Sequence, residues 1–166
     1  MELDKPVELD RIEKQMILLL QKNGRMPYVE MAEAIGVTEG TIRRKFNRLV
    51  SEGIIKIAVV ANPHAIGFDS PAIILIKTDP HRALEVAERV STLPGVRFVA
   101  LTTGSSDLII EGYWANNREL SQFLTVELSQ VPGVREFSTS LVLKLVKQTY
   151  DWGVPGNPTG EDEDAE

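Results

Sequence analysis

The sequence predicts two domains, an all-α domain followed by an α+β domain. Three observations support this prediction. Apolar residues recur at helical spacing near the start of the chain, a glycine-containing turn leads into a basic helical segment, and the second half contains a repeated strand–helix–strand pattern. The corresponding boundaries are residues 1–60 for the first domain, 61–70 for a linker, 71–150 for the second domain and 151–166 for an acidic tail.

Composition excludes several classes of protein. The chain has no cysteine, so disulfides, thiolate metal sites and cysteine nucleophiles are ruled out. No apolar run approaches the roughly 18 residues that cross a membrane, and no apolar signal core follows the first residues. We therefore expect a cytoplasmic protein that does not enter a membrane.

The net charge of −6 is unevenly distributed along the chain. Six acids and no Lys or Arg follow Tyr150, so the preceding part is neutral overall: Asp151, Glu161, Asp162, Glu163, Asp164 and Glu166. The Pro, Gly and acid content of this segment predicts a solvated, disordered tail. A local positive face, and not the net charge, decides whether DNA can bind.

Three helical patterns make up the first domain. Apolar residues between 8 and 22 follow the 3.6-residue period and stop at an Asn-Gly pair. Pro27 opens a second, short helix that ends at Gly36. Thr38 is a suitable N-cap for a third helix that runs to Glu52. The apolar face of this third helix is predicted to carry Ile42, Phe46, Leu49 and Val50.

The second and third helices, joined by Ile35-Gly36-Val37-Thr38, form a predicted helix–turn–helix unit. The outward face of the third helix carries cations, small residues and an amide, a combination that suits a DNA groove. A solvated surface helix and a protein-interaction module are the alternatives. The β-branched segment from Ile54 to Val60 predicts a strand, either in a small wing or at the start of the linker.

Eight residues of this unit are predicted to contact DNA. Six lie at the start or on the outward face of the third helix, within reach of base edges or adjacent phosphates: Thr38, Gly40, Thr41, Arg44, Asn47 and Arg48. Arg44 has the hydrogen-bond fork for guanine and Asn47 the fork for adenine. Arg43 and Lys45 lie on the flanks and are predicted to hold phosphates. A dimer would present two such helices to a pseudo-palindromic site on double-stranded DNA.

The second domain contains an internal repeat. Leu93-Pro94-Gly95-Val96-Arg97 recurs 38 positions later as Val131-Pro132-Gly133-Val134-Arg135. Each copy follows a helical pattern and leads into a strand, and each helix is preceded by a strand, so the order is β-α-β-β-α-β, as in ferredoxin-like folds. The expected strands cover 72–76, 96–101, 108–113 and 137–146. Large apolar residues on both sides of these strands predict that a second subunit covers one face of the sheet, giving a homodimer.

Several short motifs in the same order resemble the leucine-responsive regulator (Lrp/AsnC) family of transcription regulators, over residues 8–150. In the first domain they are Leu9-Asp10-Arg11-Ile12-Glu13, Asn23-Gly24-Arg25, Val37 to Lys45 and Gly53-Ile54-Ile55; in the second, Thr103 to Leu108 and Pro132-Gly133-Val134 with Thr139. The resemblance implies a winged helix–turn–helix reader and a ferredoxin-like regulatory domain that dimerises and often assembles into octamers. It also implies a small-molecule effector, which in many members is an amino acid.

The resemblance places the effector at Gly104, Ser105, Ser106, Asp107 and Thr139. The Gly-Ser-Ser turn offers backbone N–H and hydroxyl groups to a carboxylate, and Asp107 offers a partner for an α-ammonium group. In the alternative interpretation Asp107 caps the turn and Thr139 only pairs across the sheet. Family members usually have an aromatic residue at the position of Ser106 and an arginine at that of Lys45.

Two other functions compete with sequence-specific regulation. Some proteins with this domain order resemble decarboxylases of sirohaem-type tetrapyrroles, and His81 with Arg82 is the only pair that would suit such a site. His81 is more simply a residue at a helix start. The sequence shows no Ser/His/Asp arrangement, phosphate-binding glycine loop or metal-ligand cluster, so we expect no catalytic residue, metal or cofactor. A DNA-architectural protein without an effector is the other alternative.

Overall fold

The computed structural model describes residues 7–149, 153 and 154. These residues belong to two compact units, one built from the chain up to Val59 together with the chain from Lys147, and the other from Val60–Val146. The predicted disorder of the acidic tail concerns residues that, apart from Gly153 and Val154, lie outside the described part. None of the described helices is long and apolar enough to cross a membrane.

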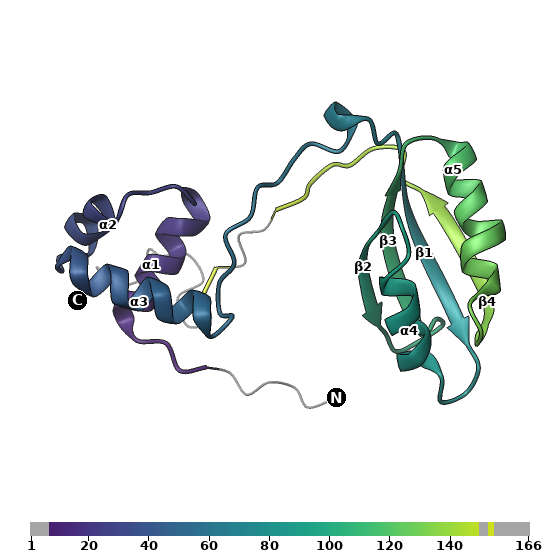
Figure 1. Cartoon of the computed structure of the whole chain (residues 1–166), viewed down its shortest axis with the longest axis horizontal. Helices are drawn as coiled ribbons and strands as arrows, with labels where there is room; N and C mark the ends of the chain where they lie inside the picture. The colour runs from purple at the N-terminus through teal and green to yellow at the C-terminus, as the bar shows by residue number, and fades with distance from the viewer. Residues whose placement is uncertain (1–6, 150–152, 155–166) are drawn as a thin grey trace. The chain divides into compact units, whose positions relative to one another are not determined.

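The first unit contains the three expected helices, α1 (Arg11–Lys22), α2 (Tyr28–Ile35) and α3 (Glu39–Ser51) (Figure 1). A reciprocal capping box starts α1. The Asp10 carboxylate accepts from the Glu13 N–H at 2.9 Å, and the Glu13 carboxylate accepts from the Asp10 N–H at 3.1 Å. Gly36, with φ of 77°, ends α2 in the left-handed conformation that glycine adopts without strain.

The core of the first unit lies between the three helices. Four of its side chains are fully buried, namely Met16, Met31, Ile42 and Leu49. Val154 joins them from the far end of the chain and is only 4% exposed. The prediction that Val50 faces this core is wrong, because 44% of Val50 is exposed. At 100° per residue Val50 lies about 80° from Ile42, at the margin of the apolar face.

The strand expected from Ile54 to Val60 does not form. This segment is irregular, and within the described residues no other segment pairs with it. Its first two N–H groups, those of Ile54 and Ile55, donate instead to the Leu49 carbonyl at 2.9 and 3.1 Å. Residues that favour strands form a strand only when a second strand is hydrogen-bonded to them. This segment has no such partner within the described residues and therefore stays irregular.

The second unit has the predicted β-α-β-β-α-β order. Its elements are β1 (Ser70–Thr78), α4 (Ala83–Ser91), β2 (Val96–Leu101), β3 (Leu108–Trp114), α5 (Asn117–Gln122) and β4 (Val134–Leu141). Neighbouring strands are antiparallel in the order β2-β3-β1-β4. This confirms the expected ferredoxin-like arrangement, which Figure 1 shows with α4 and α5 beside the sheet.

The last strand is shorter than predicted. We expected it to reach Val146, but β4 ends at Leu141, opposite Ala72 of β1. The next bond is from the Val142 N–H to the Pro71 carbonyl at 2.9 Å. Because Pro71 has no N–H, it cannot donate a hydrogen bond back to β4, and the ladder ends at this position.

Both helices pack on one face of the sheet. Their buried residues, including Val86, Val90, Leu120 and Phe123, form one core with alternate residues of β1 and β3. The other face has no covering element in the described chain, and large apolar side chains remain exposed there, with Ile73 at 41% and Phe98 at 51%. An uncovered apolar sheet face of this kind is typical of an association surface.

Candidate nucleic-acid interface and effector loop

The start of α3 presents two threonine hydroxyls and a glycine. The Thr38 hydroxyl accepts from the Thr41 N–H at 3.3 Å and lies 3.0 Å from the Thr41 hydroxyl, so it caps the helix as predicted. Gly40 is exposed, and a Cβ built there would meet only the Thr38 hydroxyl, at 3.9 Å. The free chain therefore has room for a side chain at Gly40, and only a bound partner would require its absence.

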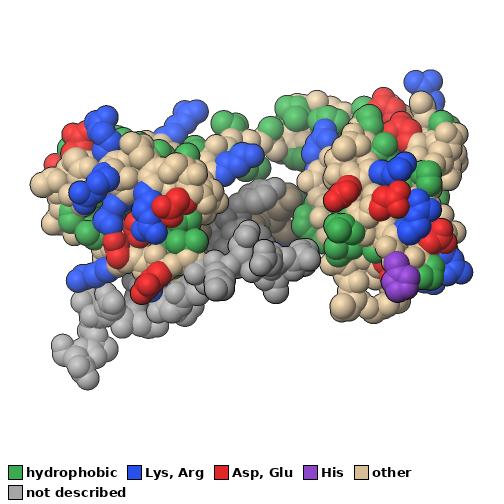
Figure 2. Space-filling model, turned by 60° about the horizontal axis from the view of Figure 1, so that its bottom comes forward, with side chains coloured by type: hydrophobic (Ala, Val, Ile, Leu, Met, Phe, Trp, Pro, Cys, Tyr) green, Lys and Arg blue, Asp and Glu red, His purple; other side chains and the backbone are tan. Residues whose placement is uncertain are grey.

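Arg44 and Asn47 lie on the exposed side of α3. Within the described residues the Arg44 guanidinium forms no ion pair or hydrogen bond, so its donors are available to a ligand. Arg43 is held differently. Its guanidinium bonds to Glu39 at 2.5 Å and lies 5.5 Å from the centre of the Tyr28 ring, with 61% of the side chain still exposed. Figure 2 shows Lys and Arg side chains gathered on this unit with acids between them.

Lys45 and Arg48, both predicted to contact DNA, are paired with acids of the α1 capping box, and Arg48 keeps 39% of its side chain exposed. Lys45 pairs with Asp10 and lies 3.6 Å from Glu13, so that only 15% of its side chain is exposed. Arg48 donates to Glu13 at 2.7 Å and pairs with Glu52 at 3.1 Å. The Glu13 carboxylate is fully buried, and a buried carboxylate needs cationic partners to remain ionised. The acids of the α1 capping box thus hold both cations, and Lys45 is the more buried of the two.

This ion-pair cluster, made of Asp10, Glu13, Lys45 and Arg48, shifts ionisation equilibria. Burial alone would raise the pKa of Asp10, but hydrogen bonds from Lys45 and from the Glu13 N–H outweigh it and lower that pKa. Hydrogen bonds to Glu52 and Glu13 raise the pKa of Arg48. Because the pKa of Asp10 is lowered on folding, its contribution to stability is present above the usual aspartate pKa and is lost as the pH falls through the lowered value.

The expected effector residues fall into two separate places. Gly104, with φ of 113°, and Ser105 are exposed in the loop between β2 and β3, where the Ser106 carbonyl accepts from the Thr102 hydroxyl at 2.8 Å. The Asp107 carboxylate accepts from the Thr78 N–H at 2.7 Å and from the Thr78 hydroxyl at 3.2 Å. Asp107 therefore fastens the loop to the end of β1, a long-range role that neither interpretation of this residue predicted.

Thr139 lies on β4 opposite Ile74, in the middle of a strand. No hydrogen bond connects it to the 104–107 loop within the described residues. The single chain thus does not join Thr139 and the loop into one site.

The two residues that the enzyme interpretation singles out, His81 and Arg82, take part in the local structure at the start of α4. Arg82 donates to Glu85 at 3.0 Å and lies 3.9 Å from Asp79. His81 has a positive φ of 65° where the chain turns into α4. Among the described residues no group of three or more His, Asp or Glu side chains is arranged to hold a metal ion.

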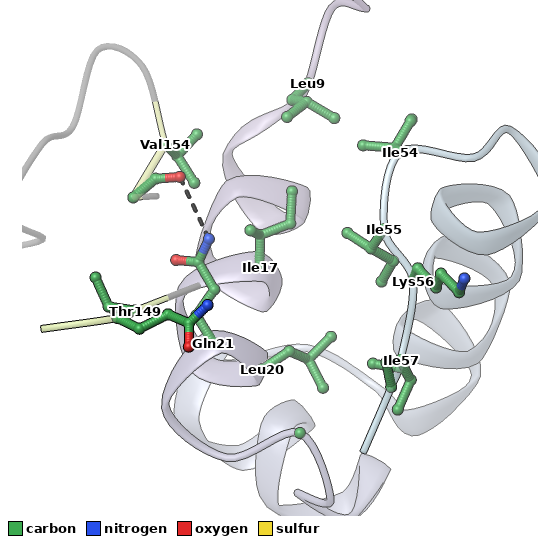
Figure 3. A pocket seen from close by; sticks show the side chains of 14 residues that line it. Leu9, Ile17, Leu20, Gln21, Ile54, Ile55, Lys56, Ile57, Thr149 and Val154 are labelled. Atoms are coloured by element: carbon green, nitrogen blue, oxygen red, sulfur yellow. Dashed lines mark hydrogen bonds between the residues drawn. The ribbon is translucent and has the colours of Figure 1, made fainter. Parts of the chain in front are cut away.

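Sequence reasoning missed a groove in the first unit. It has a volume of about 910 Å³ and lies between α1, residues 54–58 and four residues of the returning chain, Gln148, Thr149, Gly153 and Val154 (Figure 3). The Gln21 amide donates to the Gly153 carbonyl at 3.4 Å and holds the returning chain beside α1. In Figure 3 isoleucines from α1 and the 54–57 segment line the groove, while the Lys56 amine points away from α1. The wall is therefore largely apolar.

Family models match both units. A model described as winged helix-turn-helix DNA-binding matches residues 9–56, and one described as Lrp/AsnC ligand binding domain matches residues 71–152. Among curated proteins, HTH-type transcriptional regulator FL11 of Pyrococcus furiosus is 37% identical over 144 residues, 86% of this chain and 95% of that protein. An uncharacterised HTH-type transcriptional regulator of Pyrococcus abyssi is 34% identical over 145 residues, 87% of this chain and 92% of that protein.

Solved structures have the same fold over most of the chain. A Neisseria meningitidis transcriptional regulator in complex with L-Met superposes with a TM-score of 0.78 at 26% identity and covers 89% of this chain and 97% of its own. AsnC of E. coli superposes with a TM-score of 0.79 at 20% identity and covers 87% of this chain and 98% of its own.

Proposed function

This chain belongs to the Lrp/AsnC family of DNA-binding transcription regulators with a ligand-binding domain, and on that premise we propose which of its residues serve each task. Arg44 and Asn47 read base edges, because both are exposed on α3 and Arg44 has donors without a partner. Thr38, Gly40 and Thr41 approach the backbone at the helix start, and Arg43 holds a phosphate. The availability of Arg44 is the observation that carries this proposal. Lys45 and Arg48 contribute indirectly, because their ion pairs with Asp10 and Glu13 fasten α3 to α1.

Replacing Arg44 with alanine is expected to weaken binding to a specific operator and to leave binding to scrambled DNA much less affected. The lost bidentate contact corresponds to roughly 1–3 kcal/mol at one base pair. Titrations of both DNAs at two salt concentrations measure the two effects separately. Lys22→Ala is the control, since it removes one exposed charge from α1 of the same unit. An equal loss on both DNAs for Arg44→Ala would refute base reading by Arg44.

We further propose that the effector is an amino acid held at the 104–107 loop. Exposed Gly104 and Ser105 offer N–H and hydroxyl donors to a carboxylate, and the structurally similar N. meningitidis regulator was solved with L-Met. Because Thr139 is not joined to this loop within one chain, a second copy would have to bring it there. Calorimetry with the twenty amino acids tests the proposal.

The same sheet supports a homodimer. The uncovered face carries Ile73 and Phe98, which an identical face of a second copy would bury. Phe98→Glu is expected to raise the dimer dissociation constant about thirtyfold or more, the usual size of a central interface loss. Light scattering over a concentration series measures it. The control is Val126→Glu, at an exposed apolar residue of the helical turn that follows α5. Identical masses for Phe98→Glu and the parent chain at every concentration would contradict this interface.

A further inference from the structure

A cleft of the α+β unit is lined by charged side chains of both signs that do not pair with each other. It has a volume of about 270 Å³ and is bordered by Arg97, Glu127, Tyr113, Trp114 and Phe68. A second acid at its border, Glu119, already accepts hydrogen bonds from the Ala115 N–H at 3.2 Å and from the Asn116 amide at 3.3 Å. The Arg97 guanidinium donates to the Val96 carbonyl at 2.9 Å, but neither Arg97 nor Glu127 forms an ion pair within the described residues. A cation and an acid that line one cleft and leave each other unpaired suit a ligand that carries both charges.

An irregular turn brings Glu127 to this cleft. After α5 ends at Gln122, the chain continues in a wider helical turn over Phe123–Glu127. There the Leu128 N–H donates to the Phe123 carbonyl, an i→i−5 bond in place of the usual i→i−4 bond. Turns of this kind are rare and often mark functional sites. They shift every following side chain around the helix axis, here including Glu127.

A bulge in β2 turns Arg97 out of the ladder. Val96 pairs with Gly112 and Phe98 with Glu111, so Arg97 is an extra residue without an opposite. The repeated motif has the same bulge in β4, where Thr78 pairs with Val134 and Lys77 with Glu136. The bulge is therefore present in both copies of the repeat. The two copies differ in the side chains that surround them.

The second copy of the motif has different surroundings. The loop that precedes Arg135 packs against Arg82, and Arg82 is paired with Glu85 at 3.0 Å and with Asp79 at 3.9 Å. Its helix α4 is regular. Arg135 forms no ion pair within the described residues either, so the cleft at Arg97 differs from the second copy by its aromatic walls and by the irregular turn that carries Glu127.

We propose that this cleft binds an α-amino acid with an apolar side chain, its carboxylate at Arg97 and its ammonium at Glu127. The aromatic residues would contact the side chain, and charge-assisted hydrogen bonds at both ends would fix the orientation. The volume suits a small metabolite, because pockets for drug-sized ligands begin at roughly 300 Å³.

This site is separate from the loop at 104–107. Ser70 pairs with Trp114 at one end of the β1–β3 ladder and Ile76 with Leu108 at the other, six residue steps or about 20 Å apart. The inference therefore goes beyond the effector site proposed above and stands or fails without it.

Calorimetry of the full-length chain with L-leucine tests the proposal, with 3-methylbutylamine and 4-methylpentanoate as analogues that each lack one charge. Both analogues are expected to bind about tenfold more weakly or worse, and so is L-leucine to Arg97→Gln and to Glu127→Gln. Arg135→Gln is the matched control at the equivalent repeat position and is expected to bind as the parent chain does. L-leucine should also shift the indole N–H resonance of Trp114, assigned with a Trp114→Phe variant.

A Ser105→Glu variant separates this site from the loop site, because its added negative charge repels a carboxylate there. Binding that survives Ser105→Glu but not Arg97→Gln supports the cleft and counts against the loop. Binding that is lost only in Ser105→Glu supports the loop and overturns the cleft. Absence of any effect of L-leucine on Trp114, or equal loss in Arg97→Gln and Arg135→Gln, also overturns it.

Discussion

Replacing Glu13 with alanine is expected to lower the unfolding free energy of the DNA-binding unit by about 3 kcal/mol. The Glu13 carboxylate is fully buried and accepts from Arg48 at 2.7 Å and from the Asp10 N–H at 3.1 Å, with Lys45 at 3.6 Å. The alanine variant loses the ion pairs, one half of the capping box and the packing of the side chain. Breaking a buried pair costs about 3–5 kcal/mol, and the lower end applies because Arg48, at 39% exposure, can be rehydrated.

Hydrogen exchange of the full-length chain measures this loss separately in each unit, because exchange reports the opening of individual segments. Amides of α1 and α3 should lose protection while those of β1 and β3 keep it. The control is Glu33→Ala, an exposed residue of α2 that forms no ion pair within the described part, with an expected change of at most about 0.5 kcal/mol. Equal protection in the two variants would show that the ion-pair cluster contributes nothing to stability.

Replacing Gly112 with alanine is expected to destabilise the α+β unit by about 1–3 kcal/mol, the usual cost of overpacking. The Trp114 indole lies over this residue of β3 and packs against Phe123, with ring centres 4.7 Å apart and ring planes inclined by 44°. A Cβ at Gly112 would lie within 2.8 Å of Trp114 Cζ3 and 3.0 Å from the Gly95 carbonyl. Trp114 is only 6% exposed and lies against Gly95, Gly112 and Phe123, so the ring cannot move away from Gly112 without disturbing these contacts.

Exchange of the β1 and β3 amides measures this second effect. The double variant Gly112→Ala with Trp114→Phe tests the cause, because a smaller ring relieves the clash. Its two changes should couple by 0.5 kcal/mol or more, the range found for residues in contact. If the two losses add without coupling, the ring is not what excludes a side chain at Gly112.

Local patterns were sufficient to predict the elements and their order. The 3.6-residue period of α1, the cap at Thr38 and the end of α2 at Gly36 are properties of a few neighbouring residues, and all appear in the structure as expected. The left-handed glycine expected after α1 does not occur, because Asn23 ends that helix in an extended conformation and Gly24 has no positive φ. The repeat around Gly95 and Gly133 predicted the β-α-β-β-α-β order, because each copy marks the passage from a helix into a strand. Strands were predicted less well, since β4 ends where Pro71 removes a donor and 54–60 has no described partner.

By itself, then, the sequence determined the two-unit organisation, the helices and the helix that we propose faces DNA, since these follow from the spacing of apolar residues and from turn chemistry. Only the tertiary structure decided which charges remain available. Lys45 and Arg48 are joined to acids 35 residues away in the sequence, so their direction depends on how α3 crosses α1 and not on the pattern of α3 alone. The same reason applies to Arg97 and Glu127, which come from a strand and a helix and meet at one cleft only after the sheet has formed.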